Sequence, residues 1–158
     1  LQLTCNDRNL MRCPYALNEI AVLKRDSSSM ISIHTAINGA PLTTYQADGL
    51  IVATPTGSTG YSMAAGGPIV EPEASAIIVS PICAHMMSAR SYVLSASHDV
   101  SVLAEKLHGR RAYISVDGNS VMDLANGDLL RVRRSERCIL MADMGLKSFF
   151  DLAFEKLT

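Results

Sequence analysis

The sequence has few charged and aromatic residues, and it has none of the features typical of a membrane or exported protein. Asp, Glu, Lys and Arg make up 18% of its 158 residues, aromatic residues make up 5%, and Trp is absent. No run of about 18 apolar residues and no basic-then-apolar leader is present, so we expect a cytoplasmic protein without a membrane partner. The formal net charge of −1 gives no indication of nucleic-acid binding.

The cysteines form no C-x-x-C pair, which is the spacing that a zinc site would favour. With no such pair, no metal site is predicted, no disulfide follows from the spacing, and reduced thiols are expected. The four cysteines are Cys5, Cys13, Cys83 and Cys138. The apolar content of 48% is enough for a substantial buried core, and the length fits one domain over residues 1–158.

Most of the chain is typical of short strands separated by turns. Residues 31–37 alternate isoleucine with smaller or polar residues, and Asn38-Gly39 follows, which indicates a hairpin with a return strand over 41–45. Further strands are predicted over 50–53, 76–79, 100–107, 112–116, 120–124, 129–133 and 138–142. Strands about ten residues apart, with turns between them, predict a mainly β protein with an antiparallel β-sandwich.

Only two helices are predicted. A short one covers 58–65, after a glycine-rich loop. The other closes the chain, where Phe150, Phe154 and Leu157 recur at i, i+4 and i+7.

The most informative segment, residues 48–70, is a buried strand that leads into a loop dense in hydroxyls and glycines. Its letters are DGLIVATPTGSTGYS over 48–62 and AGGPIV over 65–70. Such a loop offers backbone N–H groups and rotatable hydroxyls to a small ligand, although a polar turn without a ligand is an equally open interpretation. No Walker sequence is present, and the glycines around Ser58 have the wrong spacing for a nucleophile elbow.

The same segment resembles the signature of the NAD kinase family, in which Asp-Gly precedes Thr-Pro-Thr-Gly-Ser-Thr-Ala/Gly-Tyr. Residues 16–20, Ala-Leu-Asn-Glu-Ile, resemble an upstream element of that family. Residues 81–90 resemble its Pro-Ile-x-Pro-His-Ser-Leu-Ser-x-Arg element, with Ala84 in place of Pro and Met86-Met87 in place of Ser-Leu. Asp117-Gly118-Asn119 is similar to its Asp-Gly-Gln turn, so the resemblance spans nearly the whole chain.

The resemblance implies phosphorylation of the adenosine ribose 2′-hydroxyl of NAD to give NADP, with ATP and Mg²⁺, or polyphosphate, as the phosphoryl donor. It also implies that this chain is the C-terminal, dinucleotide-binding domain and forms a homo-oligomer, either a dimer or a tetramer. The family's Gly-Gly-Asp-Gly motif does not occur in the sequence, which starts at Leu1 rather than Met. We therefore expect an N-terminal α/β domain outside this sequence, assign no catalytic residue, and expect the chain alone to be inactive.

The resemblance further implies the roles of individual residues. Asn18 and Thr59 would hydrogen-bond the adenine with Thr56 nearby, and Tyr61 would line the adenine pocket. Asp48 would accept a hydrogen bond from the nicotinamide carboxamide, and Glu19 would lie beside the ribose or support Asn18; a structural turn or cap is the alternative for both acids. Cys83 would approach the nicotinamide from a neighbouring subunit, or would be a buried structural thiol. The predicted dinucleotide-binding residues are Asn18, Glu19, Asp48, Thr56, Gly57, Ser58, Thr59, Gly60, Tyr61, Cys83 and His85.

Two other functions stay open from the sequence. A lipid kinase of the diacylglycerol or sphingosine type shares the two-domain plan, but it would not be expected to combine the Thr-Pro-Thr-Gly-Ser-Thr-Gly-Tyr string with Asn18-Glu19. A regulatory or assembly domain that binds NAD or NADP without catalysis is the non-enzymatic alternative.

Overall fold

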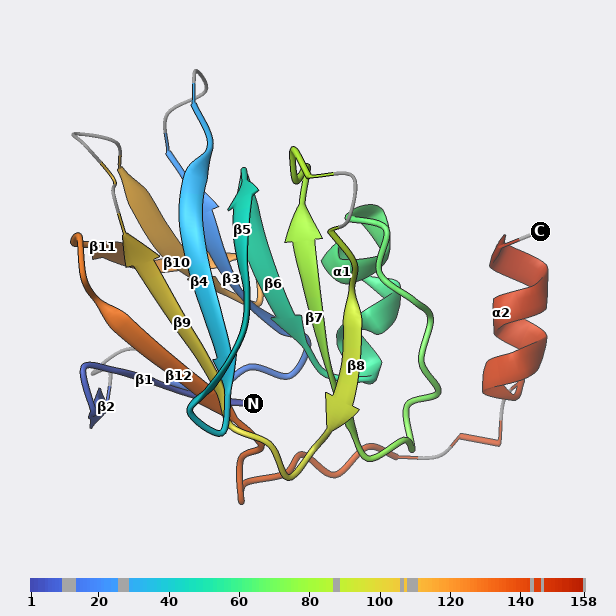
Figure 1. Ribbon diagram of the computed structural model, residues 1–158. Helices are drawn as coiled ribbons and strands as arrows, with labels where there is room; N and C mark the ends of the chain where they lie inside the picture. The colour runs from blue at the N-terminus through green and yellow to red at the C-terminus, as the bar shows by residue number, and fades with distance from the viewer. Residues whose placement is uncertain are drawn as a thin grey trace.

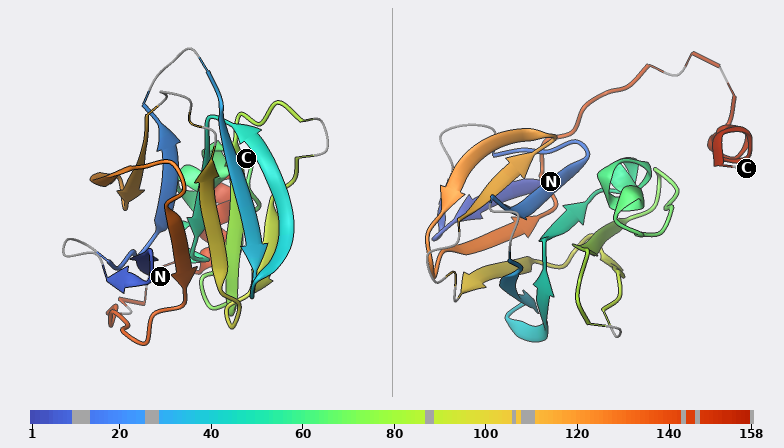
Figure 2. Two further views of the ribbon diagram at one scale, coloured as in Figure 1. Left: turned by 60° about the vertical axis from the view of Figure 1, so that its left-hand side comes forward. Right: turned by 90° about the horizontal axis from the view of Figure 1, so that it is seen from above.

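Two antiparallel sheets face each other in the computed structural model, which describes residues 1–9, 14–25, 29–86, 89–105, 107, 111–142, 144–145 and 147–157 (Figures 1 and 2). The predicted mainly β sandwich is confirmed. The first sheet has the order β2-β1-β12-β9-β4-β5, with strands Arg8–Asn9, Gln2–Cys5, Leu129–Arg133, Val100–Glu105, Ile31–Ile37 and Ala40–Ala47. The second has the order β11-β10-β3-β6-β7-β8, with strands Asn119–Leu124, Ala112–Val116, Glu19–Lys24, Gly49–Ala53, Ala76–Ile82 and Tyr92–Ser95.

The main core lies between the two sheets, where alternate residues of each strand point inward. Ile31 and Ile33 of β4 pack there with Val100 and Val102 of β9. Tyr45 is the largest buried side chain in this layer, and its hydroxyl donates a hydrogen bond to the Arg90 carbonyl at 3.1 Å. Burial of these apolar side chains is the main force that holds the sheets together.

The outer face of the second sheet is covered by the segment that follows β6. This segment contains a 3₁₀ helix, η1 (Thr56–Thr59), and the short helix α1 (Tyr61–Ala64), and Figure 1 shows it beside β6 and β7. A second buried cluster forms beneath it from Ala21, Ile51, Ala53 and Ile78. Strand β6 is therefore buried on both faces, which explains its continuous apolar run.

The C-terminal part differs from the sequence prediction. The strand predicted over 138–142 is wrong, because these residues have no neighbouring strand to complete their backbone hydrogen bonds, and Leu140 is 94% exposed. The predicted closing helix is present as α2 (Phe149–Leu157), and Figure 2 shows it well away from the sandwich. The side chains of Phe154 and Leu157 lie outside the described part of the chain, as does Cys13.

Several strand boundaries also differ. Strands β1, β2, β3 and β8 were not predicted, and β9 ends at Glu105 rather than at residue 107. The helix predicted over 58–65 forms as two short pieces that are separated at Gly60. No helix in the described part of the chain is long and apolar enough to cross a membrane.

Candidate functional site

A carboxylate distant in sequence holds the start of β3 in place. Asp117 lies in the turn between β10 and β11 and accepts three backbone hydrogen bonds. They come from the N–H groups of Leu17, Asn18 and Glu19, at 2.8, 2.8 and 3.0 Å. The backbone N–H of Asp117 donates in return to the Glu19 carbonyl at 3.0 Å. These reciprocal bonds fix the position of the Asn18-Glu19 pair, because a charged acceptor makes stronger hydrogen bonds than a neutral one.

Thr54, directly after β6, joins the glycine-rich loop to the same pair. Its N–H donates to the Asn18 carbonyl at 2.8 Å, and its hydroxyl donates to the Leu17 carbonyl at 2.7 Å. The same hydroxyl accepts a hydrogen bond from the Gly57 N–H at 3.0 Å. Gly57 is pressed so closely against Asn18 that an added Cβ atom would lie 2.5 Å from the Asn18 carbonyl carbon. The two segments that resemble the family therefore meet backbone to backbone, and only glycine fits at this contact.

Ser58 and Gly67 pack the remainder of the loop onto the sheet. The Ser58 side chain is fully buried, and its hydroxyl donates to the Val70 carbonyl at 3.1 Å and accepts from the Val70 N–H at 3.0 Å. A Cβ atom on Gly67 would lie 2.5 Å from the Ser62 hydroxyl oxygen, which pairs with Ser80 of β7 at 3.1 Å. Among the predicted loop residues, Ser58 and Gly57 thus shape the loop, while Thr59 and Gly60 are exposed.

Polar side chains from these segments are left available at the edge of the sheet. The side-chain amide of Asn18 is half-buried and forms no hydrogen bond with any of the described residues. Glu19 is buried and lies close to Gly60: a Cβ atom added at Gly60 would be 3.8 Å from the Glu19 Oε2 atom. Burial raises the pKa of the Glu19 carboxyl above its ordinary value of 4.5, and the negative charge of Asp117 raises it further.

Tyr61 lies between the Asn18-Glu19 pair and a second polar group, which contains Asp48, Cys83 and His85. Burial is the main cause that raises the pKa of its phenol, and the nearby Tyr113, Cys83, Asp48 and Glu19 add to it in that order. Tyr61 is therefore within electrostatic range of both predicted acidic ligands, and its side chain is still 40% exposed. Asp48 and Glu19 lie near opposite ends of neighbouring strands: Asp48 is five residue steps along β6 from Ala53, the partner of Glu19, and these steps span roughly 17 Å.

The second polar group contains Asp48, Cys83 and His85. The Asp48 N–H donates to the Ile82 carbonyl at 2.9 Å, which places Asp48 beside the end of β7, and the exposed Cys83 follows directly with a positive φ of 47°. The His85 N–H donates to the Gln46 carbonyl at 2.9 Å, and its side chain is exposed. The Asp48 carboxylate forms an ion pair with Lys24 at 2.6 Å. Ser88, from the same resembling segment, lies outside the described residues.

Comparisons with known proteins identify the family of this chain. Residues 17–143 match the family described as the ATP-NAD kinase C-terminal domain. The chain belongs to the NAD kinase family. It is 47% identical over 151 residues to the NAD kinase of Bacteroides fragilis, a match that covers 96% of this chain and 51% of that protein. The chain thus spans about half the length of the curated NAD kinases that it matches.

Two solved structures have the same fold as this NAD kinase domain. The yeast NADH kinase complexed with NADH is 36% identical, with a TM-score of 0.74 over 83% of this chain and 39% of the yeast chain. The NAD kinase from Archaeoglobus fulgidus in complex with ATP is 35% identical, with a TM-score of 0.71 over 85% of this chain and 50% of that chain.

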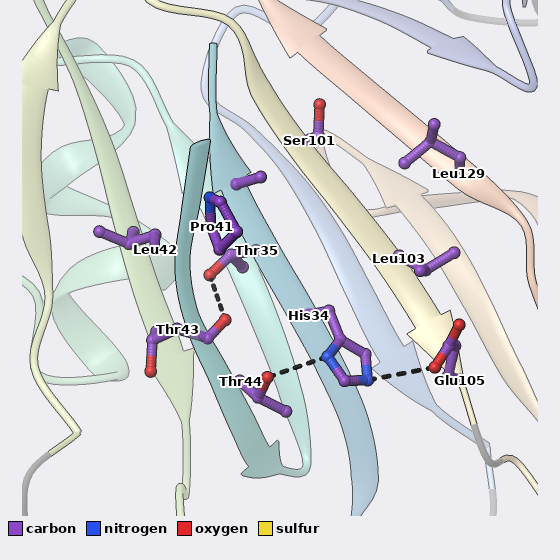
Figure 3. Close-up of a pocket in the computed structure, with 11 residues that line it drawn as sticks. His34, Thr35, Pro41, Leu42, Thr43, Thr44, Ser101, Leu103, Glu105 and Leu129 are labelled. Carbon is purple, nitrogen blue, oxygen red and sulfur yellow. Dashed lines mark hydrogen bonds and ion pairs between the residues drawn. The ribbon is translucent and has the colours of Figure 1, made fainter. Parts of the chain in front are cut away.

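A separate hollow of about 400 Å³ lies on the first sheet (Figure 3). Its lining residues Ser101, Leu103 and Glu105 alternate along β9 with the core residues Val102 and Ala104, so it opens on the face directed away from the core. It contains none of the residues that the resemblance to NAD kinases assigns. We therefore place the candidate site of this NAD kinase domain at the edge and outer face of the second sheet.

Sequence reasoning missed three residues that organise this site: Asp117, Thr54 and Lys24. A signal existed for Asp117, because it opens a turn that resembles the NAD kinase family, and Thr54 stands at the end of the apolar β6 run. Neither pattern reveals that both residues act on the backbone around Asn18. Lys24 carries no sequence signal, since its partner Asp48 is set only by the register of β3 with β6.

Proposed function

We propose that this chain is the dinucleotide-binding domain of an enzyme that phosphorylates NAD at the 2′-hydroxyl of its adenosine ribose, with ATP as the donor. The observation that carries the proposal is the convergence of Asn18, Glu19 and the loop over 54–60 at one edge of the second sheet, held there by Asp117. These are the segments that residues 16–20 and 48–62 share with NAD kinases.

The chemistry of the side chains at this edge fits an adenosine. The side-chain amide of Asn18 can donate to and accept from the edge of a base, and the Thr59 hydroxyl is exposed in the loop that packs against Asn18 through Gly57. The Glu19 carboxylate is a suitable acceptor for ribose hydroxyls, and the ring of Tyr61 offers an apolar surface against which a base or sugar can pack. Gly57 and Ser58 would act indirectly, by fixing the shape of the loop that contacts the ligand. Gly60, which has no side chain, would let the ligand approach the backbone.

The nicotinamide end would lie near Asp48, Cys83 and His85. Asp48 can accept a hydrogen bond from a carboxamide N–H, while Cys83 and His85 are exposed within the same part of the surface. The separation of roughly 17 Å between the two acidic residues along the strands suits an extended dinucleotide rather than a single nucleotide.

The phosphoryl transfer itself would need groups beyond those in this chain. Among the residues that the structure describes, no three His, Cys, Asp or Glu side chains form a group that could hold a metal ion. We therefore assign no Mg²⁺ ligand and no catalytic residue here, and ATP and its metal ion would be held largely by the other half of the enzyme. Bound Mg²⁺ would neutralise the charge that develops on the transferred phosphoryl group. We also propose that the chain works in the cytoplasm as a homo-oligomer.

Calorimetric titration of the purified chain with NAD and NADP tests the proposal. The parent is expected to bind saturably, and Asn18→Ala and Asp48→Ala are each expected to weaken binding by up to about a hundredfold, since each removes a partner of a buried ligand group. Asn38→Ala and Glu155→Gln are matched controls. Asn38 bonds Asp99 and His98 in a distant turn, and Glu155 pairs with Lys147 at 2.6 Å on α2.

The controls separate loss of the ligand site from loss of the fold. Circular dichroism should show the same β-rich spectrum for the parent and all four variants. A folded parent that binds neither dinucleotide would overturn the proposal, as would equal losses of affinity in the site variants and the controls.

A further inference from the structure

Lys24 and Asp48 form the least exposed ion pair in the described part of the chain. Their charged atoms are 2.6 Å apart, and the two side chains are 19% and 33% exposed, whereas each other ion pair has both partners at least 36% exposed. The backbone continues the contact, because the Lys24 N–H donates to the Asp48 carbonyl at 3.0 Å. Solvent screens such a pair less than it screens a surface pair.

The charge at this position matters for a nicotinamide ligand because the two redox forms of the ring differ by one positive charge. The oxidised ring is a cation and the reduced ring is neutral, while both carry the same carboxamide. An unpaired carboxylate beside the ring would attract the cation selectively. A carboxylate that is already paired with an ammonium group would accept the same carboxamide hydrogen bond from either form, with little electrostatic preference.

We propose that Lys24 determines the redox preference of this site: it neutralises Asp48, so that the site accepts reduced NADH about as well as oxidised NAD⁺. The inference rests on the proposed function, since it requires the nicotinamide end to lie beside Asp48. Without Lys24, a unit negative charge about 7 Å from the ring would favour NAD⁺ roughly fiftyfold at an effective dielectric constant of about 20, which applies near a protein surface.

Calorimetry with NAD⁺ and NADH on the same samples provides the test, and the measured quantity is the ratio of the two dissociation constants. In Lys24→Met, the NADH dissociation constant divided by the NAD⁺ dissociation constant is expected to rise roughly fiftyfold over the parent. Lys24→Arg, which keeps the charge, should restore the parent's ratio. Lys147→Met is the matched control, because Lys147 pairs at the same 2.6 Å with Glu155 of α2 and lies just before that helix, away from the site.

A double variant, Lys24→Met with Asp48→Asn, removes both charges and should return the ratio to that of the parent even if absolute affinities fall. If an unpaired Asp48 prevents folding, Asp48→Asn alone replaces the single variant: it leaves the positive charge of Lys24 at the site without the negative charge of Asp48, so the ratio should fall below that of the parent, and an unchanged ratio overturns the inference. Binding of both dinucleotides with an unchanged ratio in Lys24→Met, or a changed ratio that persists in the double variant, overturns the inference and leaves the proposed function intact. A folded parent that binds neither dinucleotide overturns both.

Discussion

Replacing Asp117 by Ala removes the acceptor that holds three consecutive backbone N–H groups at the start of β3. A hydrogen bond to a charged group contributes about 1.5–3 kcal/mol when buried, but Asp117 is half-buried and water can reach the exposed Leu17 N–H. We therefore expect Asp117→Ala to lower the free energy of unfolding by about 2–3 kcal/mol, which corresponds to a fall in Tm of roughly 5–10 °C for a domain of this size.

The same substitution should weaken the binding of NAD. With the acceptor gone, the backbone at Asn18 and Glu19 is no longer held against the loop over 54–60, so the side chains that would meet the adenosine lose their common geometry. A fall in NAD affinity of at least about tenfold is expected at a temperature where the variant is fully folded. Melting curves followed by circular dichroism give the first quantity, and calorimetric titration gives the second.

Asp128 provides the comparison that separates the two effects. Its carboxylate also holds a turn, accepting from the Ala125 N–H at 2.8 Å and from the Asn6 side-chain amide at 2.9 Å, but it lies beside the first sheet. Asp128→Ala should lower Tm while leaving NAD affinity within about twofold, since distant sites act independently. If Asp117→Ala lowers Tm as Asp128→Ala does but binds NAD like the parent, Asp117 supports only the fold and the reasoning is refuted.

Three further predictions follow from local contacts. Gly57→Ala should cost about 2 kcal/mol or more and abolish NAD binding, because its Cβ atom would collide with the Asn18 backbone; chemical denaturation and calorimetry check this. Gly60→Ala, whose Cβ atom meets nothing closer than 3.4 Å, should leave the free energy of unfolding close to the parent's in the same denaturation experiment. Because the pKa of Glu19 is raised in the folded state, the free energy of unfolding falls as pH rises through that pKa. Glu19→Gln should therefore have a higher Tm than the parent at neutral pH, and this difference should disappear in acid below the ordinary pKa of 4.5. An equal Tm difference at both pH values contradicts the prediction. A chain that ends at residue 134 should melt within about 3 °C of the parent, because α2 lies away from the sandwich (Figure 2), and a larger fall in a thermal melt would show that the removed segment supports the core.

The parts of the fold that could be predicted are those with local causes. The Asn38-Gly39 turn has φ values of 50° and 82°, and it joins β4 to β5 as the sequence indicated, because these residues tolerate a left-handed backbone. The apolar run of β6 likewise predicted a buried strand. The strand predicted over 138–142 failed for a non-local reason, since strand propensity forms no sheet without a neighbouring strand.

The candidate site could be predicted only in part. Residue types and a family resemblance indicated Asn18, Glu19 and the loop over 54–60, and their assignment to the dinucleotide stays a prediction. The parts that hold them together depend on contacts across the whole sequence: Asp117 is 98 to 100 positions from the groups it binds. Such a contact depends on the order and register of the strands, which no short pattern contains.

The large sequence separation between Asp117 and its hydrogen-bond partners also determines when, during synthesis, the proposed site can bind a ligand. The segment around Asn18 leaves the ribosome about a hundred residues before its anchor, and β10 must pair with β3 before the carboxylate arrives. Until then, all the predicted dinucleotide-binding residues can be present in the nascent chain without forming a binding surface. On the proposed function, cellular NAD would therefore not stabilise an early folding intermediate of this domain, and it would act only on chains that have already closed the second sheet.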